Sequence, residues 1–588
     1  MAFRVAVSWL LLLHQVVAIN PNPDPLVEAQ TILTPTICDF PSLEVEANNG
    51  SQLFPMPPCR GVNLEEASID EIQHYLSAGA FTSVDLVDCY RNRIFQTQEY
   101  LRAVLQHNPD AVMIAKMLDE ERAHGKLRGP LHGIPFLVKD NIATKDRMET
   151  TAGSLALLGS VVPRDSFVVD KLRRAGAILL GKAALSEWAD MRSTNYSEGF
   201  SGRGGQCRSA YNLTVNPGGS SSGSGVAVGA NLVPFALGTE TDGSVINPAQ
   251  RNAAVGIKPT VGLTSRDGVI PESLNQDTVG TFGKTVRDAT YVLDAIYGVD
   301  AHDNYTWAQE GKTPAGGYAQ FLRDRSALQG AVFGLPWDSF WRRGDPKLIG
   351  QLQALLSLIE DAGATIMNGT ELPHHERIVS PDGWDWDYGT KRGYPNESEF
   401  SYIKVDFYNN INVYLGELKN TNIRSLADLV NYNKANVGSE GGYAGVHPAF
   451  GSGQDQFEAA LASKGEMNDT YWQALEFCRR TTQVEGIDAA LRHGNRTLDG
   501  LLVPADVAQS IQIAAQAGYP VVTVPAGVDA QSGMPYGLAI LQTAFAESTL
   551  IEYASAIEDL QQFVNTRWKR SVPTWRGYKR RNVPVINE

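Results

Sequence analysis

The sequence has few cysteines, fewer basic than acidic residues, and no metal-binding motif. Five cysteines in 588 residues are too few for a disulfide framework, and no two have the C-x-x-C spacing of a zinc site. The 50 lysines and arginines face 65 aspartates and glutamates, and the net charge of −15 argues against a general nucleic-acid binder. The histidines form no H-E-x-x-H pattern. We therefore expect no metal and no nucleic-acid partner.

Long apolar runs are also missing. The run at residues 5–13 follows Arg4 and is too short for a bilayer span, which needs about 20 apolar residues. Small residues follow it, so residues 1–18 have the pattern of a secretory signal peptide cleaved after Ala18. A later stretch, 226–237, is interrupted by glycine, asparagine and proline. We expect a secreted protein with no stable membrane anchor.

Two further features are typical of an oxidising compartment. Sequons for N-glycosylation occur more often than chance predicts, at Asn49, Asn195, Asn212, Asn304, Asn368, Asn396, Asn468 and Asn495. Cys38 and Cys59 flank a short proline-rich segment, and we predict a disulfide between them. Cys89, Cys207 and Cys478 stand alone and are expected to be buried thiols.

Composition divides the rest of the chain into an extension, one large domain and a tail. Residues 19–64 are rich in proline, asparagine and threonine and predict an irregular extension, whereas 561–588 form a C-terminal tail. The domain between them, 65–560, is expected to begin with a helix capped by Ser68. Residues 375–470 are rich in tryptophan, tyrosine, asparagine and glycine without clear periodicity, and they are interpreted as an insertion packed on the main body.

Short apolar runs alternate with helical stretches through the domain. The runs at 111–113, 135–138, 178–180 and 521–524 are predicted strands, and Thr82 is a predicted cap of the second helix. Buried strands of this kind, interleaved with helices, predict an α/β fold. We expect a mixed, largely parallel β-sheet with helices on both faces.

Two glycine- and serine-rich turns are the strongest chemical signal. Residues 217–225 read P-G-G-S-S-S-G-S-G and lead into a predicted buried helix, and residues 238–248 form a second polar turn. The first turn contains a formal G-x-S-x-G elbow centred on Ser221, but Pro217 stands where the required strand should end. This mismatch weakens the elbow, but an esterase that uses Ser221 with His447 or His493 remains an alternative.

Three other candidates have simpler interpretations. Lys139 ends a predicted strand, and its position alone favours a residue at the sheet edge over a buried amine. Residues 176–182 match most of a phosphate-binding loop, but Ala183 replaces the Ser or Thr that would hold magnesium. The aromatic residues Trp384, Trp386 and Tyr388 are expected to anchor the insertion more than to line a pocket.

In their order and spacing, these segments resemble the amidase signature family. The resemblance covers roughly residues 65–560 and is concentrated at 133–260. It rests on G-I-P-F-L-V-K-D-N at 133–141, T-T-A-G-S at 150–154, A-G-A at 175–177 followed by G-K at 181–182, the run at 217–225, the turn at 238–244, G-I-K-P-T at 256–260, G-Y-P at 518–520, V-P-A-G at 524–527 and G-M-P-Y-G-L at 533–538.

The resemblance implies an amide hydrolase with a Ser–cis-Ser–Lys triad and no cofactor. Ser244 would be the nucleophile, Ser220 the bridging serine and Lys139 the base. The oxyanion hole would be the backbone amides of Thr241, Asp242, Gly243 and Ser244. The substrate would be a small-molecule or peptide amide, and the protein a secreted eukaryotic member of fungal type.

The sequence departs from the common family pattern at three positions. Asp242 stands where many members have glycine, Ser222 where glycine is frequent, and Ile246 where many members have arginine. These departures prevent the transfer of substrate preference from members that carry the arginine. A non-catalytic secreted glycoprotein is a further alternative, although all three triad residues are present.

Overall fold

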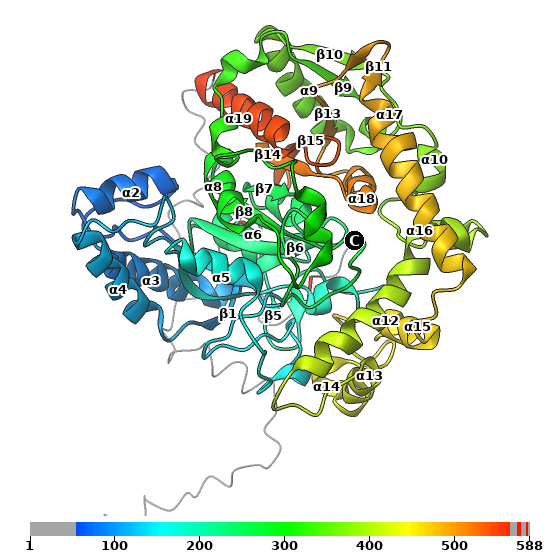
Figure 1. The fold of residues 1–588 in the computed structure, drawn as a ribbon, viewed down its shortest axis with the longest axis horizontal. Helices are drawn as coiled ribbons and strands as arrows, with labels where there is room; N and C mark the ends of the chain where they lie inside the picture. The colour runs from blue at the N-terminus through cyan, green and yellow to red at the C-terminus, as the bar shows by residue number, and fades with distance from the viewer. Residues whose placement is uncertain (1–53, 565–572, 578–583, 586–588) are drawn as a thin grey trace, which may run out of the picture.

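The computed structural model describes residues 54–564, 573–577 and 584–585. The predicted signal peptide, Cys38 and Asn49 lie outside these residues. Within them, one large mixed sheet runs through the molecule, with the N-terminal helices at one side and the helices of the insertion at the other (Figure 1). No described helix is long and apolar enough to cross a membrane.

The described part of the chain forms an eleven-stranded main sheet in the order β1-β3-β2-β6-β8-β7-β14-β15-β13-β9-β10. Its strands are β1 (Val104–His107), β2 (Pro135–Lys139), β3 (Ile178–Ala183), β6 (Phe235–Glu240), β7 (Val255–Lys258), β8 (Thr278–Gly283), β9 (Val332–Leu335), β10 (Thr365–Asn368), β13 (Gly500–Pro504), β14 (Val521–Val528) and β15 (Pro535–Leu541). Two short hairpins lie outside it, β4 (Phe200–Ser201) with β5 (Gly205–Gln206) and β11 (Arg492–His493) with β12 (Arg496–Thr497).

The predicted α/β fold and mixed sheet are confirmed, with parallel pairing confined to two groups. Strands β3, β2 and β6 are parallel neighbours, and so are β13, β9 and β10. The strands between these groups pair antiparallel, as does β1 at the edge. The sheet is therefore parallel at β3, β2 and β6, the strands around Lys139, and antiparallel through its centre, where a short connection joins β14 to its neighbour β15.

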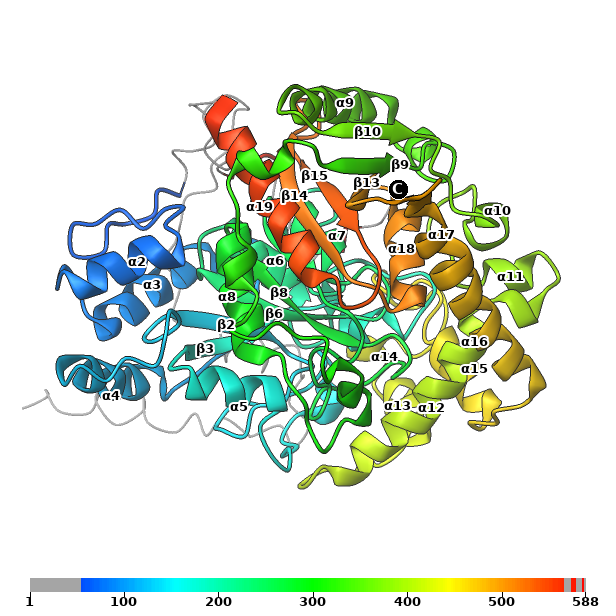
Figure 2. The same cartoon turned by 45° about the horizontal axis from the view of Figure 1, so that its top comes forward.

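Helices cover both faces of the sheet (Figure 2). Alternate residues of β15 divide between the two faces, since Ala539 and Leu541 pack in one core cluster with α6 and α18, whereas Leu538 and Ile540 pack in a second cluster with α9 and α19. The helices outside the insertion are α2 (Ile69–Ser77), α3 (Ser83–Leu101), α4 (Ala111–Ala123), α5 (Phe167–Arg174), α6 (Ser222–Gly229), α7 (Ile246–Gln250), α8 (Val286–Ile296), α9 (Pro346–Asp361), α17 (Asp488–Ala490), α18 (Ala508–Ala517) and α19 (Glu547–Val564).

The insertion is mostly helical. Figure 1 shows its helices along the side of the molecule opposite α2–α4. They are α10 (His375–Ile378), α11 (Tyr388–Lys391), α12 (Glu399–Glu417), α13 (Leu426–Ala435), α14 (Val437–Glu440), α15 (Asp455–Ser463) and, continuing beyond residue 470, α16 (Asp469–Thr482). The periodicity is weak because the first half of α12 is buried almost all round, from Glu399 to Ile403.

Local signals in the sequence were correct where a cap was visible. Ser68 and Thr82 cap α2 and α3, each with a reciprocal capping box. The predicted strands at 135–138, 178–180 and 521–524 form, but the run at 111–113 begins helix α4 instead. An apolar run of three residues does not distinguish a strand from the buried face of a helix.

The ends of the described chain pack onto the domain. Phe54 lies with its ring centroid 4.6 Å from that of Trp575, and the Arg93 guanidinium lies 5.7 Å from the Trp575 ring. The backbone N–H of Trp575 donates to the carbonyl of Ala210. Part of the predicted extension and part of the predicted tail therefore complete the same surface.

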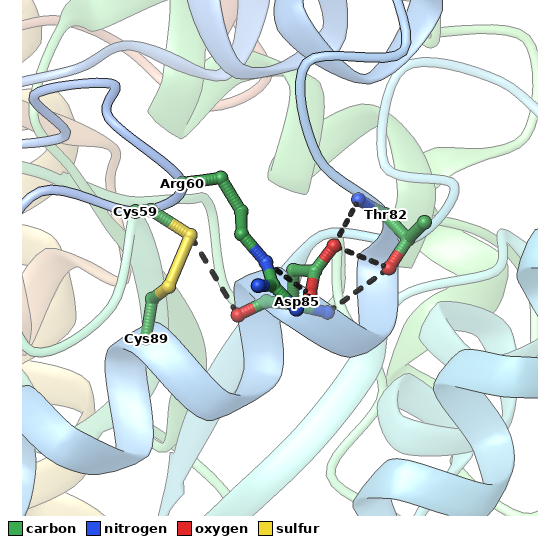
Figure 3. Close-up of a disulfide and its surroundings, with 5 residues drawn as sticks. All are labelled: Cys59, Arg60, Thr82, Asp85 and Cys89. Carbon is green, nitrogen blue, oxygen red and sulfur yellow. Dashed lines mark hydrogen bonds and ion pairs between the residues drawn. A yellow bond between two sulfur atoms is a disulfide. The ribbon is translucent and has the colours of Figure 1, made fainter.

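The disulfide joins Cys59 to Cys89, so the predicted pairing of Cys59 with Cys38 is wrong. The Cα atoms of Cys59 and Cys89 are 5.6 Å apart, and the bridge fastens the N-terminal segment to helix α3 (Figure 3). Arg60 pairs with Asp85 beside it and brings the two segments together. Proximity in sequence suggested Cys38, whereas the fold brings a cysteine 30 residues away into bonding range. Cys207 and Cys478 are buried free thiols, as predicted, whereas the same prediction for Cys89 is wrong because Cys89 is in the disulfide.

Candidate active site

The structure places Lys139, Ser220 and Ser244 in one buried chain of hydrogen bonds. The Lys139 Nζ lies 2.7 Å from the Ser220 Oγ, which lies 2.8 Å from the Ser244 Oγ. Lys139 and Ser220 have no exposed surface, and Ser244 is 5% exposed at the wall of a cavity. Residues separated by about a hundred positions are thus arranged so that a proton can pass between them.

Lys139, Ser220 and Ser244 each lie at or close to the end of a helix or strand. Lys139 is the last residue of β2, and Ser244 follows β6, the parallel neighbour of β2. Ser220 precedes α6, and the Gly219–Ser220 peptide bond is cis. Since the carboxyl ends of neighbouring parallel strands meet at one edge of a sheet, β2 and β6 deliver the lysine and the second turn to the same point.

Lys139 is held by the side chain and carbonyl of Thr239. Its Nζ donates to the Thr239 Oγ1 at 2.9 Å and to the Thr239 carbonyl at 3.3 Å, and the amide of Asn141 also donates to this hydroxyl. Burial lowers the pKa of Lys139 to about 8, and nearby carboxyl groups, Glu272 and Asp190 first, limit the fall. The expectation from position alone, a lysine that snorkels from the sheet edge toward solvent, is wrong because Lys139 has no exposed surface.

The turn at Thr241–Ser244 is fixed from several sides. Glu240 accepts hydrogen bonds from the backbone N–H groups of Val245 and Ile246 at 2.7 and 3.0 Å. The Thr241 hydroxyl donates to Asp277 at 2.5 Å, and Gln276 donates to the Thr241 carbonyl at 3.0 Å. Gly243 has φ +86°, a conformation that side chains disfavour. The turn is therefore preorganised rather than free to adapt.

Ser221 takes no part in the hydrogen bonds that connect Lys139, Ser220 and Ser244. Its hydroxyl donates to the Thr239 carbonyl at 3.0 Å, and its side chain is fully buried. Among the described residues that line the cavity there is no histidine. His447 is in ring contact with Phe200 and Phe450, and His493 is exposed on β11. The arrangement that a Ser221 esterase requires is not assembled in the described structure.

A cavity of about 130 Å³ opens onto Ser244. Its wall is formed by Ala189, Asp190, Tyr196, Glu198, Gly219, Asp242, Gly243, Ser244, Asn247, Glu272, Trp384, Trp386, Ala508 and Ile511. Trp384 and Trp386 come from the insertion, so their expected role as anchors alone was incomplete. Tyr388, which begins α11, is not part of the wall.

The carboxyl groups that line the cavity have raised pKa values. Burial raises the pKa of Asp190 and of Glu272 well above the usual range, with a further rise from neighbouring acids. Burial also raises the pKa of Glu198, whose carboxylate accepts from Ser186 at 2.9 Å and from Tyr196 at 3.3 Å. These side chains come from loops without a motif, and only the fold brings them together.

The departure at Asp242 has a structural explanation. Its carboxyl accepts from the Trp384 indole at 2.5 Å, and burial together with Glu399 raises the pKa of Asp242 well above its usual range. Glu399 in turn accepts from Gln276, Gln512 and Gln516 at 2.8 to 2.9 Å. The aspartate thus links the turn at Ser244 to the insertion. The other two departures, Ser222 and Ile246, are buried and lie outside the cavity wall.

Comparison with known proteins finds similar chains over most of this sequence. The family model described as Amidase matches residues 85–396. A protein of Schizosaccharomyces pombe that is named as an amidase is 52% identical over 562 residues, which cover 94% of this chain and 94% of that protein.

Solved structures show the same likeness. The peptide amidase of Stenotrophomonas maltophilia is 39% identical, with a TM-score of 0.74 over 86% of this chain and 98% of that one. An amidase family protein of Bacillus anthracis is 29% identical, with a TM-score of 0.74 over 87% of this chain and 95% of that one.

Proposed function

The chain belongs to the amidase family and hydrolyses the C–N bond of carboxylic amides; we propose that it does so with Ser244 as nucleophile, Ser220 as proton relay and Lys139 as base. The observation that carries the proposal is the buried chain of hydrogen bonds, with 2.7 Å from Lys139 to Ser220 and 2.8 Å from Ser220 to Ser244. A serine hydroxyl becomes a nucleophile when a base accepts its proton, and a lysine accepts one only when neutral. Burial of Lys139 provides that neutral form near pH 8.

The first half of the reaction forms an acyl-enzyme. With neutral Lys139, the hydrogen bonds run from Ser244 to Ser220 and from Ser220 to the lysine. Ser244 Oγ attacks the amide carbonyl as its proton passes to Ser220, whose own proton passes to Lys139. The carbonyl oxygen becomes an oxyanion bound by N–H groups of the turn at Thr241–Ser244, and one such donor is worth about 3–4 kcal/mol. When the C–N bond breaks, the leaving nitrogen receives its proton from Ser220, which is reprotonated by Lys139.

The second half returns the enzyme to its starting state. Water attacks the ester carbonyl of the acyl-enzyme and gives its proton to the same relay. The tetrahedral intermediate collapses to a carboxylic acid, and Ser244 recovers its proton through Ser220. The products are an acid and ammonia or an amine, and every proton step uses residues of this chain.

Labelling with a fluorophosphonate, followed by peptide mapping, tests the assignment. We expect the adduct on Ser244 in the wild type and its loss in Lys139→Ala. Ser221→Ala is the matched control, because Ser221 adjoins Ser220 in sequence and lies outside the relay; it should still be labelled on Ser244. An adduct on Ser221 would instead favour the esterase alternative, and no adduct on folded protein would favour a non-catalytic role.

For the substrate, we propose small-molecule or peptide amides. The support is the likeness to the Stenotrophomonas maltophilia enzyme, which is described as a peptide amidase. The cavity at Ser244 is narrow, about 130 Å³, so the part of the substrate beyond the reacting carbonyl is small or leaves the cavity. A panel of amino-acid amides and peptide amides, with release of ammonia as the readout, tests this range.

We also propose that the protein is secreted and glycosylated. The signal-like residues 1–18 and the Cys59–Cys89 bridge support export, since disulfides persist in oxidising compartments. Of the sequons, those with exposed asparagines are Asn195, Asn304, Asn368, Asn468 and Asn495, whereas Asn212 and Asn396 are half-buried with their amide nitrogens hydrogen-bonded. The mass of protein from culture medium, before and after removal of N-glycans, tests both points.

A further inference from the structure

The cavity beside Ser244 collects carboxyl groups from separate segments of the chain. Asp190 and Glu198 lie on the loop after β3, Glu272 on the loop between β7 and β8, and Asp242 in the turn before Ser244. Among the described residues of its wall there is no lysine or arginine. Several acids in one small space repel one another when ionised, so each is stabilised by a positive charge placed between them.

Asp190 retains an unused acceptor in this space. Its Oδ1 is buried and has no hydrogen-bond partner in the described structure. The backbone that presents it is left-handed at three successive residues, with φ +55° at Trp188, +55° at Ala189 and +82° at Asp190. Left-handed backbone at residues other than glycine is strained, and such strain is concentrated at functional sites. A buried carboxyl oxygen without a donor is costly unless a ligand supplies one.

Aromatic rings form another part of the wall. The Trp384 and Trp386 ring centroids are 5.1 Å apart, with their planes inclined at 49°, and Trp386 is 6% exposed. Tryptophan faces attract ammonium and guanidinium groups, most strongly when water is excluded. Carboxylates combined with indole rings are the chemistry that recognises an organic cation.

The cations already near these acids are engaged elsewhere. Lys139 donates to Ser220 and Thr239, and the Arg251 Nε donates to the carbonyl of Asn216 at 2.8 Å. Lys139 and Arg251 each act to lower the pKa of Glu198 and so favour its ionised form, but neither residue lines the cavity.

We propose that this cavity is a subsite for an organic cation, in which Asp190, Glu198 and Glu272 bind the ammonium or guanidinium group of a positively charged amide substrate. The inference rests on the proposed function, since Ser244 opens onto the same cavity. Asp242 is already engaged by Trp384 and Glu399 and serves the turn instead. A cavity of about 130 Å³ is small and suits a charged group on a short stem.

Matched substrates test the proposal. At pH 7.5 we expect kcat/KM for N-acetyl-lysinamide to exceed that for N-acetyl-norleucinamide by about tenfold or more. A second pair, norleucinamide against N-acetyl-norleucinamide, asks whether an α-ammonium group fills the subsite instead. A preference in either pair supports the cation subsite and identifies the source of the charge. Equal rates within both pairs, or faster turnover of the neutral amides, would overturn it.

Variants locate the preference. Asp190→Asn and Glu198→Gln should each reduce the preference for the cationic amide at least threefold, with a smaller change for the neutral amide. Glu458→Gln, an exposed acid on α15 that pairs with Lys434, is the matched control and should leave the preference unchanged. If both cavity variants keep the wild-type preference, the assignment to these carboxylates is wrong.

Competition provides a test that requires no variant to fold. n-Butylammonium should inhibit hydrolysis of N-acetyl-norleucinamide competitively, whereas n-butanol, its neutral counterpart, should inhibit at least tenfold more weakly. Equal inhibition by the two would contradict the proposal. Failure of the proposed function is distinguishable, because then no amide is hydrolysed and Ser244 takes no fluorophosphonate, whereas failure of the cation subsite alone leaves amide turnover intact.

Discussion

Two buried lysines on neighbouring strands of the same sheet differ in their hydrogen-bond partners. Lys139 ends β2, and Lys182 lies on the adjacent β3, where it pairs with Val138. Neither has exposed surface, and burial lowers the pKa of each to about 8. Lys139 faces the Ser220 hydroxyl, which continues to Ser244, whereas Lys182 donates to the carbonyl of Ile142 at 2.6 Å and to the Thr150 hydroxyl at 2.9 Å.

The difference is in what lies beyond the amine. Lys182 contacts the Ile142 carbonyl, which has no proton to pass on, and the Thr150 hydroxyl, which makes no hydrogen bond to a cavity residue in the described structure. A hydroxyl both donates and accepts, so Lys139 is connected through Ser220 to a group at the cavity. A depressed pKa therefore does not identify a catalytic lysine by itself.

Replacing each lysine with methionine should separate the two roles most strongly. Lys139→Met is expected to lower kcat by at least about 1,000-fold, because loss of one member of such a unit removes most of its effect. Lys182→Met should lower kcat less than about tenfold and act on stability instead, at about 1–3 kcal/mol for the unpaired carbonyl. Steady-state kinetics measure kcat and thermal unfolding measures stability. Similar losses of kcat in two folded variants would contradict the assignment of different roles to the two lysines.

The adjacent serines provide the next contrast. Ser220→Ala interrupts the relay and should lower kcat by at least about 100-fold, since a positioned proton-transfer group contributes roughly 10²–10⁴-fold. Ser221→Ala removes the two hydrogen bonds between this hydroxyl and the Thr239 backbone, at 3.0 Å to the carbonyl and 3.3 Å from the N–H, and should change kcat a few-fold at most. The reverse order of effects would mean that Ser221 is the reactive serine.

The hydroxyls that hold the lysines give a smaller difference. Thr239→Val removes the oxygen 2.9 Å from Lys139 and should lower kcat about tenfold, the equivalent of one hydrogen bond to a charged group. Thr150→Val removes the corresponding partner of Lys182 and should change kcat less than twofold. Both variants are compared at matched fold content by circular dichroism, and equal kcat values would show that the hydroxyl beside Lys139 has no special part.

The pH dependence is the mildest test. Because the pKa of Lys139 is about 8, its neutral form increases as pH rises, and kcat/KM should rise roughly fivefold from pH 7 to pH 8 before levelling toward pH 9. This rise should persist in Lys182→Met, since that lysine titrates in the same range without joining the relay. Loss of the rise in Lys182→Met, or a flat profile in the wild type, would contradict the assignment of the base.

Sequence was sufficient where the signal is local. Ser68 and Thr82 are followed at the right distance by the acids that complete their caps, and the glycine- and serine-rich turns keep a fixed order that identifies the family. The same order placed Lys139, Ser220 and Ser244 in one site, although the position of Lys139 alone favoured the wrong environment.

Sequence was insufficient where contacts join distant segments. The sequence does not show which cysteine forms the disulfide with Cys59. The packing of the N-terminal segment on α3 selects Cys89. Asp190, Glu198 and Glu272 follow no spacing rule, because loops rather than one element bring them together. The helices of the insertion were missed because burial on several sides removes the amphipathic pattern from α12.

The packing of Trp575 against Phe54 has a consequence for how the protein is made. These residues are about 500 positions apart, and the ribosome adds about 5–20 residues per second. The segment at Phe54 therefore emerges well before Trp575 is synthesised, and this part of the surface closes only after that. A stop codon shortly before Trp575 would remove the ring that packs against Phe54 and Arg93, and would expose them on a domain whose core is already formed.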